Sequence, residues 1–355
     1  MSNCCNDLEP LKSGDVDVLH ISRGVSRRDF LRGAAGAAGL TAMGGIVGPV
    51  WAEQKRVRLA FCSQLLCVVP YEATRAAGFF AEEGLDVELV YTRGGSAALQ
   101  ALNGGAVDYA ATSFDAALNA FSSGADIVRF ASTGRLPLFA LATSPDLAGE
   151  LESVESLQGR TIGVSALGNA DHAFMLYLLS RAGVNPESVE FATVGTNLYD
   201  AIRLGQLDAG MVQEPALSLL EESGSRVLVN GMDIDDAREY LGGAYEFMGV
   251  AVRREELEAR TEEMQALARA LGKGLRHVQS ADPAQLVESL PSEIITGGDR
   301  DQLANTLARY RASLYPEAVN MNLEAMQRVI DVNQAAGGRG GSVELDRIVA
   351  PGVVG

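Results

Sequence analysis

The chain has 355 residues, of which 47% are apolar and 21% are charged, which is typical of a globular protein with one large core or two smaller ones. Its formal net charge is −17, and no basic run follows the first fifty residues. This charge argues against nucleic acid and against an anionic membrane surface as partners.

The first 52 residues are predicted to be a signal peptide for the twin-arginine export pathway. Residues 26–31 read SRRDFL, and a weakly apolar stretch rich in Gly and Ala follows at 33–50. That stretch is too short and too rich in glycine for a stable membrane span. The small residues Val50 and Ala52 suit cleavage after Ala52. We therefore expect the twin-arginine translocase to export the chain and the mature chain to be periplasmic.

The chain has four cysteines, and two of them, Cys4 and Cys5, lie in the predicted signal. Cys62 and Cys67 remain in the mature chain, where an oxidising compartment permits a disulfide. Cys62 lies on a predicted strand and Cys67 just past its end, which is a poor geometry for a bridge. We therefore predict two buried thiols. No cysteine directly follows the apolar stretch, so a lipid anchor is not expected.

After the signal, strands and helices are predicted to alternate. Residues 85–91 alternate apolar and acidic side chains, which indicates a strand. Residues 63–69 are predicted to form a loop, because Pro70 suits the first turn of a helix. The predicted strands are 56–61, 85–91, 107–112, 127–132 and 138–143, and the predicted helices are 70–80, 96–102 and a segment that follows the polar residues 113–115 and ends at 121.

The same alternation restarts after Pro145. The predicted strands are 161–164, 189–194, 209–213, 226–229 and 245–252, and the predicted helices are one ending at 182, 197–204 and 214–222. From residue 255 the chain is predicted to be helical, with apolar residues at helical spacing at Met264, Leu267, Leu271 and Leu275. A helix at 322–335 precedes a Gly-rich tail. This alternation predicts parallel sheets with helices on both faces.

A weak internal repeat with an offset of one hundred positions suggests two equivalent halves. Gly95, Ser96, Ala101, Gly105 and Asp108 correspond to Gly195, Thr196, Ala201, Gly205 and Asp208. Each set would form a helix start with a hydroxyl, a helix, a turn with Gly and Asp, and a strand. The alternative is that any two strand–helix–strand units look similar.

Polar side chains gather at the predicted carboxyl ends of the strands, where open parallel sheets bind ligands. Gly95 and Ser96 begin a helix after a strand, so free backbone N–H groups and the positive end of a helix dipole are expected there. Taken singly, Ser96, Asn169 and Thr196 can equally be helix caps, and Asp115 can be a cap or turn residue. The candidate ligand-binding residues are Ser63, Gln64, Gly95, Ser96, Ser113, Phe114, Asp115, Gly168, Asn169, Ala170, His172, Thr196, Asn197, Gln213 and Glu214.

Residue patterns for catalysis or for cofactor binding are scarce. Of the three histidines, His20 lies in the predicted signal, His277 lies on a predicted helix, and His172 stands beside Asp171. The sequence contains no nucleophile elbow, no histidine pair at metal-binding spacing and no phosphate-binding lysine loop. We therefore expect no catalytic residues, no metal and no cofactor, and His172 is more readily explained as a structural residue.

Several segments resemble a known family. They are GFFAEEGLDVELV at 78–90 with the Gly-Gly-Ser helix start, GGAVDYAATS, LQGRTIGVSALGNADH and GQLDAGMVQEPA. Together they are similar to the periplasmic substrate-binding proteins of ABC importers for sulfonates, taurine, nitrate and thiamine-precursor pyrimidines. The resemblance extends from residue 57 to about residue 336.

The resemblance implies an α/β type II periplasmic binding protein fold, in which two doubly wound α/β lobes are joined by two crossover strands. The crossovers would be 138–143 and 245–252. Lobe 1 would comprise residues 53–143 and 245–355, and lobe 2 would comprise residues 144–244. The resemblance also implies solute contacts at Gln64, Gly95, Ser96, Ser113, Asn169, Ala170, His172 and Glu214.

As function, the resemblance implies a non-enzymatic receptor that binds a small-molecule solute and delivers it to the permease of an ABC importer. We expect it to work as a monomer. One alternative is an enzyme of the same fold, similar to a pyrimidine-precursor synthase or a chorismate-processing enzyme, although the synthase's CCCFC run is absent. Another is a periplasmic sensor subunit that works with a membrane kinase.

The sequence departs from the family in its cysteine-rich first loop, FCSQLLCV. Only Arg93 or Arg135 offers an arginine near a strand end to bind an anionic solute. Two acidic residues also bear on the charge of the solute. Asp115 and Glu214 would oppose an anion and favour an amine or a nitrogen ring, on which Phe114 could stack. The alternative is that Asp115 caps a helix and Glu214 pairs with an arginine away from the solute.

Overall fold

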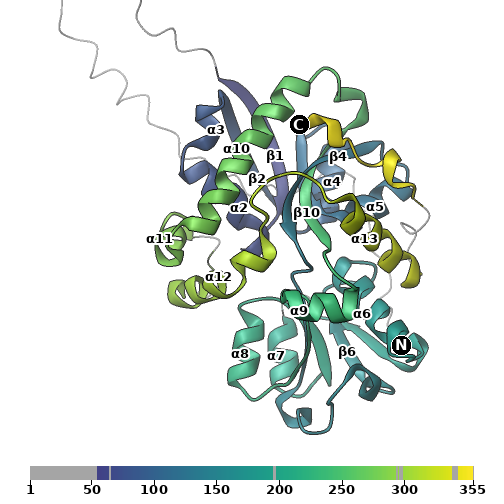
Figure 1. Ribbon diagram of the computed structural model, residues 1–355. Coiled ribbons are helices and arrows are strands. Elements are labelled where there is room, and N and C mark those ends of the chain that lie inside the picture. Colours follow the sequence, from purple (N-terminus) through teal and green to yellow (C-terminus); the bar gives the residue numbers. More distant parts are fainter. Residues whose placement is uncertain are drawn as a thin grey trace, which may run out of the picture. The chain divides into compact units, whose positions relative to one another are not determined.

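The computed structural model describes residues 54–63, 65–194, 197–292, 295, 299–337 and 343–354. Within these ranges the chain forms two five-stranded sheets, each flanked by helices (Figure 1). The expected α/β class with two sheets is confirmed. The predicted signal peptide lies outside the described residues.

The two sheets have the same topology. Sheet A has the strand order β2-β1-β3-β10-β4, and sheet B has the order β7-β6-β8-β5-β9. In each order the fourth strand is antiparallel to its neighbours, and it is supplied by chain that arrives from the other sheet. The strands of sheet A are β1 (Lys55–Cys62), β2 (Leu85–Thr92), β3 (Tyr109–Ser113), β4 (Ile127–Arg135) and β10 (Glu246–Arg253). Those of sheet B are β5 (Ala140–Thr143), β6 (Thr161–Val164), β7 (Glu190–Thr193), β8 (Ala209–Val212) and β9 (Val227–Asn230).

Helices connect and cover these strands. They are α2 (Leu65–Ala76), α3 (Phe79–Glu82), α4 (Gly95–Asn103), α5 (Phe114–Ser122), α6 (Ala170–Arg181), α7 (Leu198–Arg203), α8 (Ala216–Glu222), α9 (Ile234–Asp236), α10 (Thr261–Ser280), α11 (Pro283–Glu288), α12 (Arg300–Leu314) and α13 (Leu323–Ala335). The predicted elements omit α9, which continues into a π-helical turn at Ala237–Leu241. None of the described helices has the length and apolar character needed to cross a membrane.

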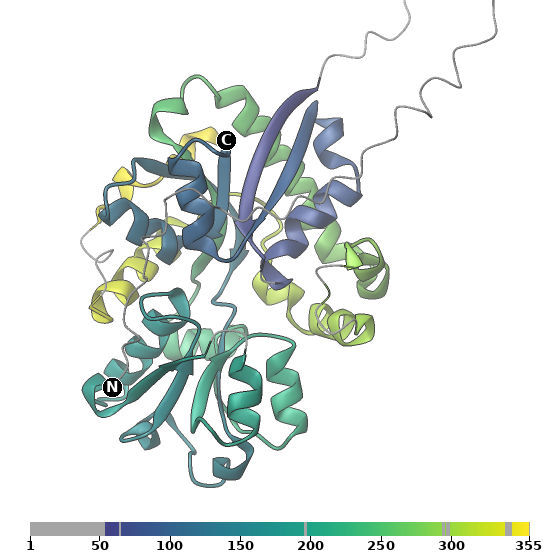
Figure 2. The ribbon, with the colours of Figure 1, turned by 180° about the vertical axis from the view of Figure 1, so that it is seen from behind.

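Sheet A has helices on both faces. Helices α2, α3 and α10 pack together on one face, and α4, α5 and α13 lie on the other (Figures 1 and 2). Along α10 the apolar residues predicted from helical spacing, such as Leu267 and Leu271, are fully buried. Gly274 allows α10 to approach α2, because a Cβ there would lie 1.8 Å from Thr74 Oγ1. This close contact holds α2, the helix that follows β1, against α10.

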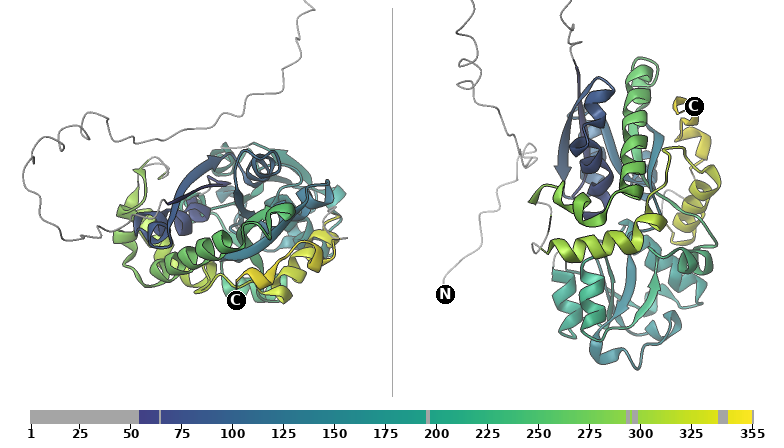
Figure 3. Two further views of the ribbon diagram at one scale, coloured as in Figure 1. Left: turned by 90° about the horizontal axis from the view of Figure 1, so that it is seen from above. Right: turned by 60° about the vertical axis from the view of Figure 1, so that its left-hand side comes forward.

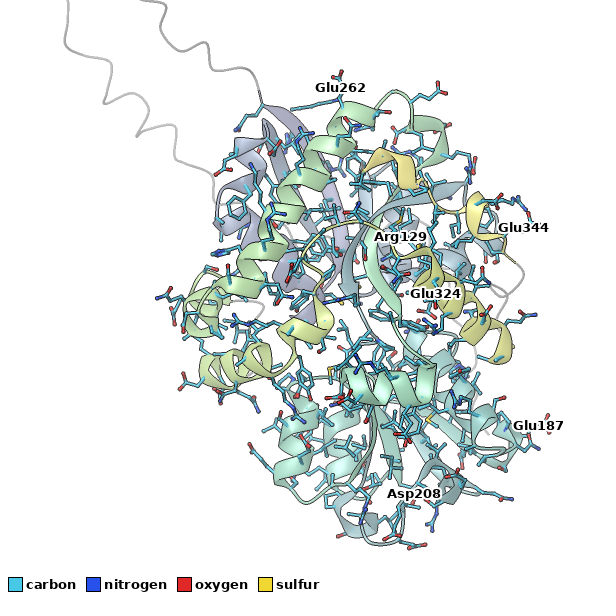
Figure 4. All side chains as sticks on the ribbon, in the orientation of Figure 1. Arg129, Glu187, Asp208, Glu262, Glu324 and Glu344 are labelled. Atoms are coloured by element: carbon cyan, nitrogen blue, oxygen red, sulfur yellow. The ribbon has the colours of Figure 1, made fainter. Side chains whose placement is uncertain are left out.

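The internal repeat is confirmed by matching hydrogen bonds. Asp108 Oδ2 accepts from the Arg58 N–H at 2.7 Å, and Asp208 Oδ2 accepts from the Thr161 N–H at 2.7 Å. In return, the Asp108 and Asp208 N–H groups donate to the carbonyls of Arg58 and Thr161 at 2.9 and 3.0 Å. Each aspartate precedes one parallel strand and bonds to the backbone of the neighbouring strand, which joins β3 to Arg58 of β1 and β8 to Thr161 of β6. Figure 4 labels Asp208.

The chain passes from sheet A to sheet B between β4 and β5 and returns between β9 and β10. The two connections lie side by side, because the Leu136 N–H donates to the Tyr245 carbonyl at 3.0 Å. Ala140 pairs with Val212 at the end of β8, and Met248 pairs with Ser113 at the end of β3. The carboxyl ends of the parallel strands in both sheets therefore lie where the chain crosses between them. The strand β5 belongs to sheet B, and the exact lobe boundaries stay a prediction.

Helix α2 begins at Leu65, so the prediction that a loop extends to Val69 is wrong, and Pro70 lies inside the helix. Proline has no N–H, so the carbonyl four residues earlier, that of Leu66, loses its helical donor. The Tyr315 hydroxyl donates to that carbonyl at 2.7 Å, across 249 positions of sequence. A distant side chain thus replaces the missing hydrogen bond, which the local sequence pattern does not indicate.

Candidate functional site

The predicted site residues follow the carboxyl ends of strands in both sheets. In sheet A, Ser63 follows β1, Gly95 and Ser96 begin α4 after β2, and Ser113 ends β3. In sheet B the residues that follow β6 are Gly168, Asn169, Ala170 and His172, the residue before α7 is Asn197, and those after β8 are Gln213 and Glu214. Gln64 and Thr196 lie outside the described residues.

Helix α4 begins without a side-chain cap. Its N-cap residue is Gly94, and the first hydrogen bond of the helix runs from the Ala98 N–H to the Gly94 carbonyl at 3.2 Å. Ser63 lies against the preceding strand, where its Oγ donates to the Thr92 carbonyl at 2.7 Å. The first N–H groups of α4 and the positive end of its dipole are therefore available to oxygen atoms of a small molecule.

Thr112 is a further candidate residue, which the sequence pattern does not identify. Its side chain is 2% exposed, and Oγ1 has no hydrogen-bond partner among the described residues. A Cβ added to Gly95 would lie 1.9 Å from Thr112 Oγ1, so only glycine leaves room for this hydroxyl at the start of α4. A buried hydroxyl without a partner costs about 1–3 kcal/mol. An acceptor atom of a solute at this position would satisfy it.

Ser113 and Phe114 have structural roles. Ser113 Oγ accepts from the Ala116 N–H at 3.2 Å and so caps α5. Phe114 is fully buried, and the Arg129 guanidinium lies 5.4 Å from the centre of its ring. The ring therefore offers no free face for the predicted stacking on a solute. The stacking prediction fails because Arg129, which is distant in sequence, covers the ring.

Asp115 is a buried acid next to the second connection between the sheets. Its Oδ1 accepts from the Tyr245 hydroxyl at 3.2 Å, and its Oδ2 has no hydrogen-bond partner in the described part of the chain. Burial raises the pKa of Asp115 to about 6, although the hydrogen bonds and the nearby Arg129 charge act in the opposite direction. At pH 7 this carboxyl is therefore mostly ionised, and it takes up a proton as the pH falls through about 6.

The loop between β6 and α6 is organised by its own side chains. Asp171 accepts from the Ser165 hydroxyl at 2.8 Å and from the Ser165 N–H, and Asn169 Nδ2 donates to Ser165 Oγ at 3.0 Å. His172 Nδ1 accepts from the Gly168 N–H at 3.1 Å, and its ring contacts Phe191 edge-on. Burial lowers the pKa of His172. His172 is therefore neutral and hydrogen-bonded within its own loop. This is a structural role, as expected for a lone histidine.

Glu214 caps a helix. Its carboxylate accepts from the Ser218 N–H at 3.1 Å and from the Ser218 hydroxyl at 3.0 Å, at the start of α8. The residue is 5% exposed, and burial raises the pKa of its carboxyl. A carboxylate with both oxygens engaged in this way is poorly placed to bind a solute amine. Capping, rather than the predicted amine contact or arginine pair, explains this acid.

A direct hydrogen bond joins the two groups of strand ends. Asn119 Nδ2 on α5 donates to the Gly168 carbonyl at 3.3 Å. This contact brings the helix that follows Ser113 beside the loop that carries Asn169 and Ala170. The structure thus places together predicted residues that lie more than fifty positions apart in the sequence.

The C-terminal segment adds a second link between the sheets. Helix α12 is the yellow-green helix beside the connections between the two sheets in Figure 3. It contacts the end of β9 and the residues that follow it. Asn230 Nδ2 donates to the Tyr310 hydroxyl at 2.9 Å, and Ser313 Oγ donates to the Met232 carbonyl at 2.8 Å. The same helix end is held by Arg135, which donates to the carbonyls of Ala312 and Tyr315. Arg135 is therefore committed to structure.

Two further observations limit what the site can do. Among the described residues, no group of three His, Cys, Asp or Glu side chains is placed to hold a metal ion. An open groove of about 460 Å³ lies along α10, lined by Arg269, Lys273 and Arg276 among others, and includes none of the predicted site residues. We therefore take the strand ends, and not this groove, as the candidate site.

The chain is similar to proteins of known family and fold. The family model described as NMT1/THI5 like matches residues 68–285. A search of curated protein sequences finds no match. A solved structure of a Bordetella bronchiseptica protein is 24% identical, with a TM-score of 0.74, covering 85% of this chain and 96% of that one.

Two further solved structures carry functional names. The alkanesulfonate-binding protein SsuA from Xanthomonas axonopodis, bound to MOPS, is 20% identical with a TM-score of 0.64, covering 86% of this chain and 99% of that one. The periplasmic nitrate-binding protein NrtA from Synechocystis is 12% identical with a TM-score of 0.66, covering 85% of this chain and 87% of that one. At these identities the likeness shows the fold, and the periplasmic binding protein fold is confirmed.

Proposed function

Because the chain belongs to the NMT1/THI5-like family, we propose that it is a periplasmic receptor that captures a small organic solute and delivers it to the permease of an ABC importer. The observation that carries the proposal is the junction of strand ends from both sheets. On the side of sheet A lie the uncapped start of α4 and the Thr112 hydroxyl, which has no partner among the described residues. The Asn119–Gly168 hydrogen bond joins this side to the loop that follows β6 of sheet B.

The solute is proposed to belong to the sulfonate, taurine, nitrate and pyrimidine class. The names of the alkanesulfonate-binding and nitrate-binding structures support this class. The first N–H groups of α4 and Thr112 Oγ1 have no partner among the described residues, and all of them can donate to an acceptor. Glu214 is already bonded to Ser218, and Asp115 lies near the positive charge of Arg129, so neither acid is well placed to hold an amine. We therefore favour a solute with an oxygen-rich acceptor group over the amine.

The proposal includes no chemical step. The acids near the strand ends are bonded to Tyr245, Ser165 and Ser218, and His172 accepts a backbone hydrogen bond. Such groups hold loops in place and do not form a paired acid and base. Export by the twin-arginine translocase, a periplasmic location and action as a monomer are part of the proposal.

A screen with the mature chain tests the proposal. Thermal unfolding is followed with alkanesulfonates, taurine, nitrate and an aminopyrimidine, since a bound solute raises the melting temperature. Calorimetry then compares Thr112→Val, which removes the hydroxyl at nearly constant volume, with the wild type. We expect about tenfold weaker binding, equivalent to about 1.4 kcal/mol.

Thr306→Val is the matched control, because Thr306 is a buried threonine on α12. It should leave the affinity unchanged. The proposal fails if no member of the panel binds, and the assignment of the site fails if Thr306→Val weakens binding as much as Thr112→Val does.

A further inference from the structure

Three sulfur atoms meet beside the end of β1. Cys62 is the last residue of β1, Cys67 lies in α2, and Met248 lies on β10. Cys67 Sγ lies 3.7 Å from Met248 Sδ, and a hydrogen bond joins the Cys67 and Cys62 thiols. The three residues, which we call the sulfur cluster, are 4%, 1% and 4% exposed. Both cysteines are buried thiols, as the sequence predicts.

We propose that the sulfur cluster of Cys62, Cys67 and Met248 is a binding site for one Cu(I) ion. The proposal goes beyond the solute-binding function and does not depend on it. Soft thiolate and thioether ligands favour Cu(I) among the first-row metals. Metal–sulfur bonds of about 2.3 Å would place the sulfurs of a three-coordinate site roughly 4 Å apart. The distance of 3.7 Å between Cys67 Sγ and Met248 Sδ is close to this spacing.

The surroundings favour a three-coordinate ion over Zn(II). Zinc sites in proteins usually have four ligands, and the described residues contain no third His, Cys, Asp or Glu beside the two thiols. The two nearest phenols are already engaged: Tyr71 shares a hydrogen bond of 2.6 Å with Thr133, and Tyr315 donates to the Leu66 carbonyl at 2.7 Å. Three sulfurs without a fourth ligand suit Cu(I), which does not require tetrahedral coordination.

Burial protects the thiols from oxidation. The pKa of Cys67 is raised, first by burial and then by its hydrogen bond with Cys62, so little of the reactive thiolate is present. A metal ion can still bind, because it displaces the thiol protons. When one Cu(I) binds through both sulfurs, each thiol releases one proton to the solvent and the copper stays Cu(I), so no oxidant or reductant is consumed. Cu(I) affinity should therefore rise with pH.

The site can be reached from the surface over a short distance. Ser63, the residue next to Cys62, is exposed, and Met248 pairs with Ser113 at the end of β3. The cluster therefore lies directly behind the strand ends.

An anaerobic titration of the reduced mature chain with Cu(I), in competition with the chromogenic chelator bicinchoninate, tests the proposal. We expect one Cu(I) per chain. Cys67→Ser should weaken binding by about 100-fold, and Met248→Leu, which keeps the volume, by about tenfold. Met326→Leu is the matched control, because Met326 is fully buried on α13 away from the cluster. It should bind copper as the wild type does.

X-ray absorption at the copper edge keeps the test decisive if Cys67→Ser does not fold. The wild type should show three sulfur neighbours, and Met248→Leu should show two. The proposal is overturned if copper has nitrogen or oxygen neighbours, or if Cys67→Ser folds and competes with the chelator as well as the wild type. It is also overturned if thiol titration in denaturant detects no thiols, since the two cysteines then form a disulfide.

Discussion

The Tyr245 hydroxyl donates a hydrogen bond of 3.2 Å to Asp115 Oδ1, and so joins the second connection between the sheets to the first turn of α5. Helix α5 also carries Asn119, which bonds to Gly168 in the other half. Asp115 is 2% exposed, and burial raises the pKa of its carboxyl to about 6. A group that titrates near neutral pH thus lies in the junction between the sheets.

The stability of the protein should depend on the protonation of Asp115. The carboxyl has an ordinary pKa of 3.8 and a pKa of about 6 in the folded chain. The folded state therefore holds the proton more tightly. Its contribution to the free energy of unfolding is fully present below pH 4 and is lost as the pH rises through about 6. The loss amounts to about 3 kcal/mol.

Urea unfolding of the wild type and of Asp115→Asn between pH 4 and pH 7.5 measures this effect. Asparagine carries no titrating proton and can still accept from Tyr245. The unfolding free energy of the wild type should fall relative to that of the variant across this range. Other buried acids with raised pKa values, such as Glu246 and Asp171, are present in both proteins, so the difference between the two isolates Asp115. A difference that does not change with pH would contradict the prediction.

Gly95→Ala should destabilise the start of α4. The added Cβ would lie 1.9 Å from Thr112 Oγ1, and overpacking of this kind costs about 1–3 kcal/mol. Chemical unfolding of the single variant and of Gly95→Ala combined with Thr112→Ala measures the clash. The second substitution should recover most of the loss. Gly149→Ala, which meets nothing within 4 Å, is the control. Equal losses at Gly95 and Gly149 would rule out the packing explanation.

Tyr310→Phe should weaken the link between α12 and the chain that follows β9. The substitution removes the oxygen that accepts from Asn230 Nδ2 and leaves that amide buried without this partner. The expected loss in the free energy of unfolding is about 1–3 kcal/mol. Tyr199→Phe, at a half-buried tyrosine on α7, should change stability by less than about 0.5 kcal/mol. Similar losses in the two variants would show that the Asn230–Tyr310 bond is not the cause.

Glu214→Gln separates the helix-cap role from a solute contact. Glutamine can still accept from Ser218, so the cap at α8 is largely preserved. We expect the affinity for the identified solute, measured by calorimetry, to change by less than about threefold, or about 0.7 kcal/mol. A loss of tenfold or more would instead support the amine contact that the sequence alone suggests.

The sequence identifies features that depend on local pattern. The alternation of strands and helices predicts the α/β class, and the repeat predicts equivalent roles for Asp108 and Asp208, which make the same two backbone hydrogen bonds. The apolar spacing in α10 predicts its buried face. Each of these depends on residues that are close in sequence or related by a constant offset.

Features that depend on distant partners are not visible in the sequence. Helix α2 continues through Pro70, and the Tyr315 hydroxyl bonds to the Leu66 carbonyl that the proline leaves without a helical donor. Arg129 covers Phe114, and Thr112 on β3 faces Gly95 at the start of α4. The polar strand ends are predicted correctly as positions, but whether an acid such as Glu214 binds a solute or caps a helix depends on local geometry that composition does not reveal.

The central claim is that the strand ends of the two sheets hold one small solute. Native mass spectrometry of the chain, purified gently from its native host, tests it most directly. The account predicts one non-covalent small molecule per chain, released on denaturation and bound more weakly by Thr112→Val than by Thr306→Val. A chain that carries no small molecule, and that binds none of the sulfonate, nitrate or pyrimidine panel when refolded, would contradict the account.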